Sequence, residues 1–192
     1  LGLNEACLAH TGSELKKDSL VFGEKILQEL QKQTEAASEN LGMRVLLSER
    51  PGDEAASRLA ELDVEHYGKS TVSAQGSRNS PFYTDMPSVP LTSKVSLSER
   101  LAIEGMLQTL TPGGHLAVIT VDSKATTEAL LSVSHEAAAS GIRFMTYSRA
   151  YSFCRNCNRV IAGLVTSCSS CASGNVGQYG RSSSTYIPVA LW

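Results

Sequence analysis

The chain has 192 residues, 42% of them hydrophobic, which is enough to bury a core and indicates one globular domain, or one domain with a small appendage. Its formal net charge of −2 leaves no broad basic field for a phosphate backbone, so a general nucleic-acid binder is excluded and no direct nucleic-acid binding is expected. No apolar run reaches the roughly 18 residues of a membrane helix, and the first residues lack the pattern of a secretory signal, so we expect a soluble chain without membrane insertion.

The first part of the chain predicts a long helix followed by a short strand. Apolar residues recur at helical spacing across residues 13–41 among Lys, Glu and Gln, and Gly42 ends the pattern. Residues 43–48 are apolar and partly β-branched, and they stop shortly before Pro51. This pattern is typical of a strand that runs into a turn.

The middle of the chain predicts a helix on each side of a long loop. Residues 55–62 favour one or two helical turns, and residues 70–93 are rich in Ser, Pro and Thr, which indicates an extended loop. Loops of this length inside a compact domain are usually functional. Helical periodicity returns at residues 98–110, with Ser98 as the expected N-cap, and ends before Gly113.

Two strands around a helix come next. Residues 115–121 predict a buried strand, residues 126–139 an Ala- and Leu-rich helix, and residues 142–147 a second strand. This order of elements is typical of an α/β domain, and a separate small unit is expected from Phe153 onward. We interpret His115 either as a residue that binds phosphate or orients a loop, or as a satisfied structural donor.

Four of the five cysteines form two C-x-x-C pairs, with ten residues between the pairs. Each pair can turn both thiolates toward one ion, and two pairs complete a tetrahedron. We therefore predict a Zn²⁺ site. Its ligands are Cys154, Cys157, Cys168 and Cys171. The alternatives are two redox-active dithiols or an iron–sulfur cluster, but thioredoxin-like pairs lie at a helix start, and these lie among Ser, Gly and Asn.

The residues between the two pairs suffice for a small hairpin, with Val160 and Ile161 on one side of a turn at Gly163 and Leu164 and Val165 on the other. A zinc ion with four thiolates is coordinatively closed, so it stabilises the fold without catalysis. Clustered cysteines also favour a reducing compartment over a secreted disulfide framework.

Short segments spread over nearly the whole chain match one protein family in order and spacing. They are Gly2-Leu-Asn-Glu-Ala6, Thr11-Gly12, residues 49–60, Tyr83-Thr84, Val89-Pro90, Ile103-Glu104, Gly113-Gly114-His115, Gly141-Ile142, the four cysteines, and the tail Tyr186-Ile-Pro-Val189 up to Trp192. In this order they resemble the C-terminal part of an anaerobic (class III) ribonucleotide reductase, whose large subunit is a glycyl-radical enzyme.

The resemblance implies an α/β fold derived from a ten-stranded α/β barrel, here a half-barrel followed by a four-cysteine zinc ribbon. The family reduces ribonucleoside triphosphates through a thiyl radical on a loop cysteine. A C-terminal glycyl radical, installed by a radical-SAM activase, generates that thiyl. The resemblance divides the chain into a reductase-like region at residues 1–152, a zinc ribbon at 153–175 and a tail at 176–192 that corresponds to the glycyl-radical loop.

The tail departs from the family pattern. In the family it carries Arg-x-x-Gly-Tyr before a Pro-Val-x-x-Trp ending, and this alignment places Arg181 on the family's Arg and Ser184 on the radical glycine. A backbone radical persists at Gly because the planar α-carbon carries no side chain, so we expect no stable radical at Ser184. Gly177 and Gly180 lie nearby, but neither follows an Arg by three residues.

Other family positions also differ. The family's Pro-Ala-Glu is replaced at residues 51–53, where Asp53 keeps a carboxylate one methylene shorter. Residues 83–86 replace Tyr-Thr-Asn-Ser, and residues 148–152 replace Asn-His-Pro-Val-Asp. Asp53 and its neighbour Glu54 are interpreted either as an acid–base pair or as a solvated helix start.

Two functional hypotheses follow from the resemblance and its departures. The first is a degenerate, non-catalytic relative that acts as a zinc-stabilised structural or assembly subunit, with other protein subunits of a larger complex as partners. The second is the C-terminal portion of an active reductase, and only there is a nucleoside triphosphate expected as ligand. A free-standing zinc-ribbon module fits the cysteines but leaves the larger α/β part unexplained.

The origin and location of the chain are expectations from the same residues. The sequence begins without Met in a stretch typical of a domain interior, which indicates a fragment or a chain processed from a longer precursor. The cytoplasm or the mitochondrial matrix is the expected compartment. Cys7, outside the cluster, is expected to be a buried structural thiol.

Overall fold

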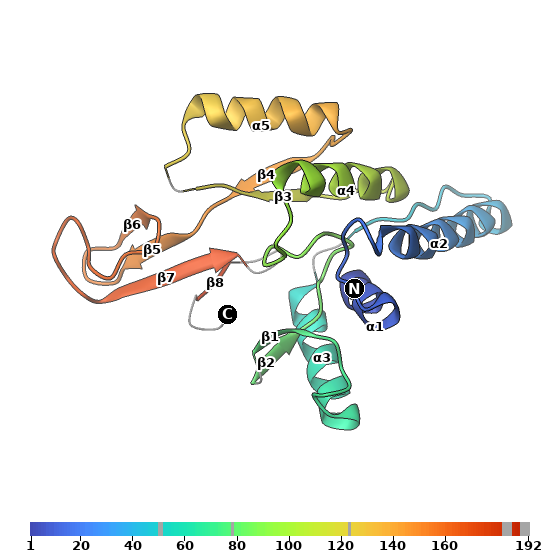
Figure 1. Ribbon diagram of the computed structural model, residues 1–192, viewed down its shortest axis with the longest axis horizontal. Helices are drawn as coiled ribbons and strands as arrows, with labels where there is room; N and C mark the ends of the chain where they lie inside the picture. Colours follow the sequence, from blue (N-terminus) through green and yellow to red (C-terminus); the bar gives the residue numbers. More distant parts are fainter. Residues whose placement is uncertain (50–51, 78, 123, 182–185, 189–192) are drawn as a thin grey trace.

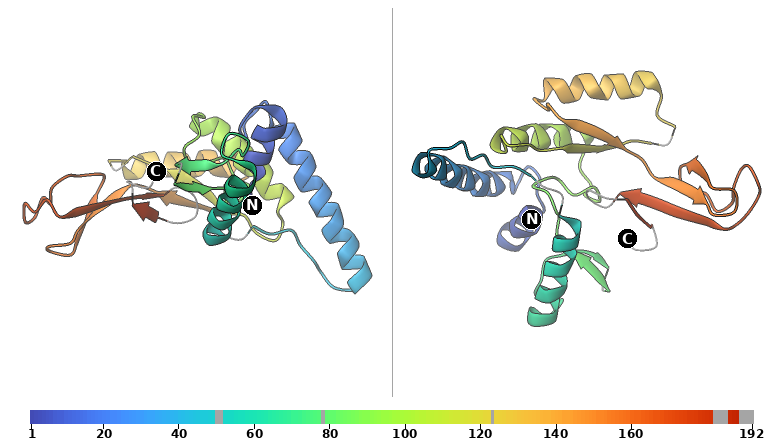
Figure 2. Two further views of the ribbon diagram at one scale, coloured as in Figure 1. Left: turned by 90° about the horizontal axis from the view of Figure 1, so that it is seen from below. Right: turned by 180° about the vertical axis from the view of Figure 1, so that it is seen from behind.

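The computed structural model describes residues 1–49, 52–77, 79–122, 124–181 and 186–188. Helices and short strands form a body, and a four-stranded sheet built from the C-terminal residues projects from it (Figure 1). The two further views show the end of this sheet at β5, β6 and the start of β7 extending beyond the helices (Figure 2). Among the described residues, no helix combines the length and apolar composition that crossing a bilayer requires.

Two helices, α1 (Leu3–Thr11) and α2 (Leu20–Leu41), begin the chain. The single helix predicted over residues 13–41 is wrong at its start. The Leu15 amide donates to Asn4 Oδ1 at 2.8 Å, and this bond holds the residues before Leu20 in a turn against α1. The predicted end is confirmed, because Gly42 follows α2 with a left-handed φ of 64°.

The next segment contains less strand and more helix than the sequence predicted. Residues 43–48 form only an isolated parallel bridge between Ser48 and Gly114. Helix α3 (Asp53–Tyr67) runs for 15 residues, well beyond the one or two turns expected. The predicted loop over residues 70–93 contains an antiparallel hairpin of β1 (Gln75–Ser77) and β2 (Ser80–Phe82).

The α/β layout predicted for residues 98–147 is confirmed. Helix α4 (Leu97–Leu110), β3 (Ala117–Thr120), α5 (Thr127–Ala139) and β4 (Met145–Ser148) follow in order, and β3 pairs with β4 in parallel. A parallel pair needs a crossover, which α5 supplies. The core between these elements contains Leu101 of α4, Ala117 and Ile119 of β3, Ala137 of α5 and Ile142 before β4.

The N-cap of α4 is Ser96, not Ser98. The Ser96 side chain accepts a hydrogen bond from the Glu99 amide at 3.2 Å, and Ser96 has the extended backbone that an N-cap requires. Ser98 is already inside the helix. Two serines lie two residues apart in the sequence. Ser96 is the cap because its backbone is extended, whereas Ser98 is already helical.

The C-terminal sheet has the antiparallel order β6-β5-β7-β8, with β5 (Tyr151–Cys154), β6 (Arg159–Ala162), β7 (Val176–Arg181) and β8 (Tyr186–Pro188). The hairpin predicted between Val160-Ile161 and Leu164-Val165 is wrong. Strand β6 pairs instead with β5, so Val160 lies opposite Phe153. Residues 163–165 turn across the sheet, and the Val165 amide donates to Ser152 Oγ at 3.0 Å.

Candidate metal centre and buried polar clusters

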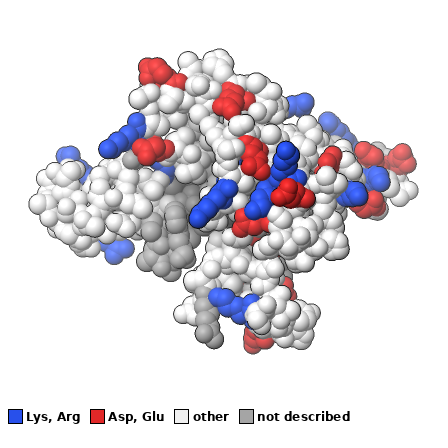
Figure 3. Space-filling view, in the orientation of Figure 1, with Lys and Arg blue, Asp and Glu red and all other residues white. Residues whose placement is uncertain are grey.

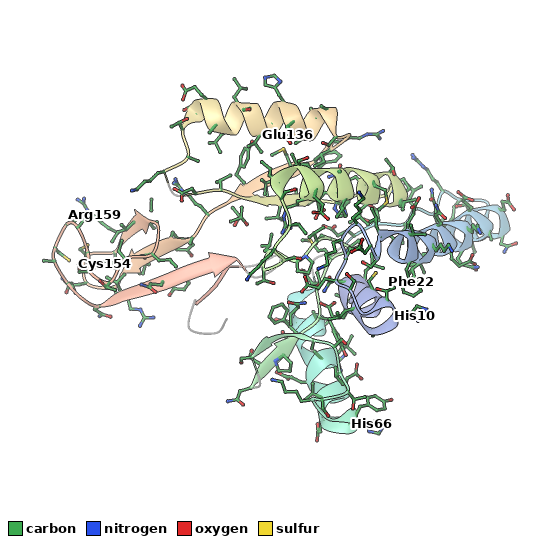
Figure 4. All side chains as sticks on the ribbon, viewed as in Figure 1. His10, Phe22, His66, Glu136, Cys154 and Arg159 are labelled. Atoms are coloured by element: carbon green, nitrogen blue, oxygen red, sulfur yellow. The ribbon has the colours of Figure 1, made fainter. Side chains whose placement is uncertain are left out.

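The four cysteines of the two C-x-x-C pairs converge. Their sulfur atoms all lie within 4.8 Å of one another. Cys154 Sγ is 3.6 Å from Cys171 Sγ, and Cys157 Sγ is 3.6 Å from Cys168 Sγ. Cys154 ends β5, Cys157 lies in the turn between β5 and β6, and the second pair precedes β7 (Figure 4 labels Cys154). The cysteines predicted as ligands are therefore brought together and could hold a metal ion.

The spacing of the sulfurs matches one tetrahedral ion. With bonds of about 2.3 Å to the metal, the sulfurs of a four-thiolate zinc site are separated by about 3.8 Å. Two donors also face the sulfurs: the Ser170 amide is 3.4 Å from Cys168 Sγ, and Asn156 Nδ2 is 3.6 Å from Cys171 Sγ. Donors of this kind orient thiolate ligands around a metal.

A left-handed residue follows the second cysteine of each pair. Asn158 has φ 56° and Ala172 has φ 55°, and no other non-glycine residue in the described part of the chain has a positive φ. Asn adopts this conformation readily, whereas Ala is strained in it. The two pairs therefore share one turn geometry. In the sequence, Asn158 indicates this turn after the first pair, whereas Ala172 gives no such indication after the second.

The protein environment changes the acidity of the ligand sulfurs. Hydrogen bonds from the backbone amides of Ser170 and Cys171 lower the pKa of Cys168 to about 6. Burial first, and the neighbouring sulfurs next, raise the pKa of Cys157 to about 12. A thiolate is the form that binds metal, so metal binding at this site displaces protons and becomes stronger as the pH rises.

A second buried cluster contains His115 between two carboxylates. His115 Nδ1 is 2.9 Å from Glu49 Oε2, and His115 Nε2 is 2.8 Å from Glu104 Oε2. The His115 side chain is 0% exposed, and the two carboxylate side chains are 3% and 1% exposed. Burial alone would lower the pKa of His115, but the bonds and charges of Glu104 and Glu49 together raise it to about 9.

This cluster is structural. Both ring nitrogens of His115 face carboxylates, so the hypothesis that it binds phosphate is wrong. The interpretation as a satisfied structural histidine is confirmed, because each ring nitrogen lies within 2.9 Å of a buried carboxylate oxygen. The two carboxylates are held in turn by backbone amides: Glu49 accepts from the Leu116 amide at 3.1 Å and Glu104 from the Val89 amide at 2.9 Å. The sequence analysis did not identify Glu49 and Glu104 as the partners of His115. For Glu104 a signal was available, because it is a carboxylate among the apolar residues on the buried side of the helix that contains Leu101.

A third cluster joins two of the segments that carried the family resemblance. Glu5 of α1 is buried and accepts hydrogen bonds from the Thr84 amide at 3.0 Å and the Thr84 hydroxyl at 2.8 Å. Tyr83 donates to Asp63 Oδ2 of α3 at 2.6 Å, and burial, followed by this bond, raises the pKa of Tyr83 to about 12. Glu5, Asp63 and Tyr83, with further residues of α1 and α3, line a cavity of about 410 Å³.

The remaining predicted residues have mixed outcomes. Asp53 is the first residue of α3, but its side chain is not among those described, so the acid–base interpretation stays a prediction. Ser184 lies outside the described residues, and Arg181 is described only as the last backbone position of β7. Cys7 is buried, as predicted, and burial raises its pKa.

The fold is similar to that of solved anaerobic ribonucleotide reductases. The Thermotoga maritima enzyme with glycerol in the active site matches with a TM-score of 0.70 and 20% identity, over 91% of this chain and 26% of that chain. The same enzyme in complex with dATP and CTP matches with a TM-score of 0.68 and 20% identity, over 91% of this chain and 27% of that chain. A third structure, described as an anaerobic ribonucleotide reductase, matches with a TM-score of 0.68 and 19% identity, over 91% of this chain and 26% of that chain.

These similarities establish the fold, and the chain spans about a quarter of the length of the solved reductases that it matches. Comparison with curated protein sequences gave no match. The family model for anaerobic ribonucleoside-triphosphate reductase, however, matches residues 1–189, which is nearly the entire chain. With its reductase-like α/β fold and its cluster of four cysteines, this chain belongs to the anaerobic ribonucleoside-triphosphate reductase family.

Proposed function

We propose that this chain is a non-catalytic member of the reductase family that acts as a zinc-stabilised structural or assembly subunit of a larger complex. The observation that carries the proposal is the tail, where Arg181 is followed three residues later by Ser184 in place of the family's radical glycine. A side chain on the α-carbon crowds the planar centre that a backbone radical requires, so Ser184 removes the group that starts the reaction.

The two nearby glycines do not replace the missing one. Gly177 and Gly180 lie inside β7, where they pair with Phe153 and Ile187. A Cβ built on Gly177 would be 2.9 Å from the Tyr179 ring, which packs over it. A radical glycine must be reachable by the activase and by the cysteine that it oxidises, and a position within a paired strand is accessible to neither.

Zinc is the proposed metal, and its role is structural. Four thiolates at tetrahedral separations suit Zn²⁺ and leave no open coordination position for a substrate or water. We therefore assign residues 153–175 to a zinc ribbon between a reductase-like region at 1–152 and a tail at 176–192. The reduced ligands are consistent with a reducing compartment.

A partner protein is proposed because the reductase-like region resembles an incomplete barrel. Within the described residues, the one further parallel contact beside the pair β3–β4 is the bridge between Ser48 and Gly114. Large apolar side chains on α2 and just after it are exposed, among them Val21 at 61%, Leu41 at 65% and Met43 at 61%. A half-barrel with uncovered apolar surface is stabilised by another protein surface.

One specific observation keeps the active-reductase alternative open. The family match is continuous over residues 1–189, and the chain spans about a quarter of the solved reductases, so another polypeptide segment could supply the rest of a working barrel. In that case a ribonucleoside triphosphate would be the substrate. The two proposals differ in whether this polypeptide carries a radical.

Electron paramagnetic resonance after anaerobic incubation with a radical-SAM activase tests the proposal. We expect no glycyl doublet from the wild-type chain, and a doublet would overturn the non-catalytic assignment. The variant Ser184→Gly restores the family's motif, so a doublet from it alone shows that the activase reaches this tail and that Ser184 blocks the radical. A second measurement, the mass of the zinc-loaded chain in solution and in cell extract, tests the partner: a stable, isolated monomer in both contradicts the assembly role.

A further inference from the structure

The cavity between α1 and α3 has the dimensions of a small-molecule site. The two helices lie next to each other in the fold (Figure 1). Helix α3 contributes Leu59, Asp63 and Tyr67, which recur every four residues and therefore share one helix face, and α1 contributes Ala6 and Ala9. The alanine side chains are too short to fill the space opposite α3, and about 410 Å³ remains. Sites for small molecules are roughly 300–1,000 Å³ in volume.

Two carboxylates line this cavity without a cation. Glu5 is 4% exposed, and its hydrogen bonds come only from neutral amide and hydroxyl groups. Asp63 Oδ2 accepts from the neutral hydroxyl of Tyr83. In the described part of the chain, no ion pair involves either carboxylate, and no Lys, Arg or His lines the cavity. Dipoles therefore hold the two negative charges, and nothing described there neutralises them.

The rest of α3 adds to the negative potential of the cavity. The helix contains five acidic residues and one arginine, a formal charge of −4. Asp63 lies in its C-terminal half, near the negative end of the helix macrodipole, where a cation is favoured and a carboxylate is not. Elsewhere over the helices, positive and negative side chains are interspersed on the visible face (Figure 3). The cavity is therefore a local site of attraction for a positive charge.

The walls of the cavity favour an organic cation over a metal ion. Hard metal ions take about six or more oxygen ligands, and in the described residues the cysteines, not these carboxylates, form a group of three or more possible ligands. Asp63 Oδ1 accepts no hydrogen bond from the described residues, so it is available to an ammonium donor. Leu59 and Val72 line the remaining wall with the rings of Tyr67 and Tyr83, which attract a cation through their faces.

We propose that the cavity between α1 and α3 binds a small organic amine in its protonated form, with the ammonium group held by Asp63 and the apolar body against Leu59 and Tyr67. Such a ligand is opposite in charge to a ribonucleoside triphosphate, which the two carboxylates repel. The cavity is therefore not a nucleotide site. The proposal is independent of whether the chain is catalytic.

Isothermal titration calorimetry of the full metal-loaded chain with phenethylamine tests the proposal. We expect saturable binding of this amine at neutral pH. Phenethyl alcohol, which is neutral, and hydrocinnamate, which is anionic, have similar size and should bind at least about tenfold more weakly, because each lacks the charged donor. Asp63→Asn keeps an acceptor for Tyr83 but removes the charge, so it should weaken phenethylamine binding at least about tenfold.

The matched control is Glu61→Gln, which removes the same charge from an exposed position of α3 outside the cavity and should leave the affinity unchanged. Circular dichroism verifies folding, and if Asp63→Asn misfolds, Ala9→Leu replaces it and should abolish binding by filling the cavity from α1. The proposal is overturned by absence of saturable binding at millimolar amine, by equal binding of the alcohol, or by an equal loss in Glu61→Gln. Tighter binding of a short peptide with one lysine also overturns it, because the cavity then belongs to a side chain of a partner protein.

Discussion

His115→Gln offers the most direct test of the buried cluster. The substitution leaves Glu49 and Glu104 facing each other without the cation between them. The rise in the pKa of His115 from 6.5 to about 9 corresponds to about 3 kcal/mol, at about 1.4 kcal/mol per pH unit. Removing one partner from a buried ion pair costs about 3–5 kcal/mol in other proteins. We expect the free energy of unfolding at pH 6 to fall by about 3 kcal/mol.

The pH dependence of this loss has a definite sign. The folded pKa of His115 is above its unfolded value, so its stabilisation is complete below about pH 6.5 and is lost as the pH rises through about 9. The difference in stability between wild type and His115→Gln should therefore shrink between these values. Urea unfolding followed by circular dichroism at pH 6, 7.5 and 9 measures it, and titration of groups that do not contact His115 cancels because both proteins share them.

The control is His135→Gln, which changes an exposed histidine on α5 and should alter the free energy of unfolding by less than about 0.5 kcal/mol at each pH. A loss below about 1 kcal/mol in His115→Gln at pH 6 would refute the reasoning, and so would a loss that stays constant from pH 6 to 9. Either result would mean that the carboxylates do not hold His115 as a cation.

Three further substitutions test local features. Ser96→Ala should lower the free energy of unfolding by about 1 kcal/mol by removing the cap of α4, whereas Ser98→Ala should have little effect; equal effects in urea unfolding would contradict the cap assignment. Ala172→Gly should relieve a left-handed residue and strengthen metal binding at the four cysteines by about 1 kcal/mol in competition with a chelator, and unchanged affinity would count against that strain. Gly105→Ala would place a Cβ 1.9 Å from the Ser140 carbonyl oxygen, so thermal unfolding should show a loss of at least about 2 kcal/mol; an unchanged melting temperature would disprove this close approach.

Features that depend on neighbouring residues were predictable from the sequence. The end of α2 follows from Gly42, which adopts the left-handed conformation that closes a helix. The convergence of the cysteines follows from C-x-x-C spacing, since each pair forms its own turn. The two helices and two strands between residues 98 and 147 follow from the spacing of their apolar residues, because burial against one core imposes a helical or strand period on each.

Features that depend on distant contacts were not predictable. Residues 13–19 have helical spacing, but Asn4 accepts from the Leu15 amide and stops the helix from starting there. Glu49 and His115 are far apart in sequence, and nothing local identifies them as an ion pair. Strand β6 pairs with β5 because the turn at the first cysteine pair is itself the hairpin turn, which the apolar pattern around Gly163 did not indicate.

The short link between the body and the C-terminal sheet has a mechanical consequence. Only two residues separate β4, which ends at Ser148, from β5, which begins at Tyr151. The Val121 amide donates to the Ser148 carbonyl at 2.8 Å, and the Gly163 amide donates to the Ala150 carbonyl at 3.0 Å, so the link is fastened on both sides. Force applied to the last strands is therefore transmitted directly to the parallel pair. The end of the chain that carries the four cysteines should move rigidly with the body and not as a unit on a flexible linker.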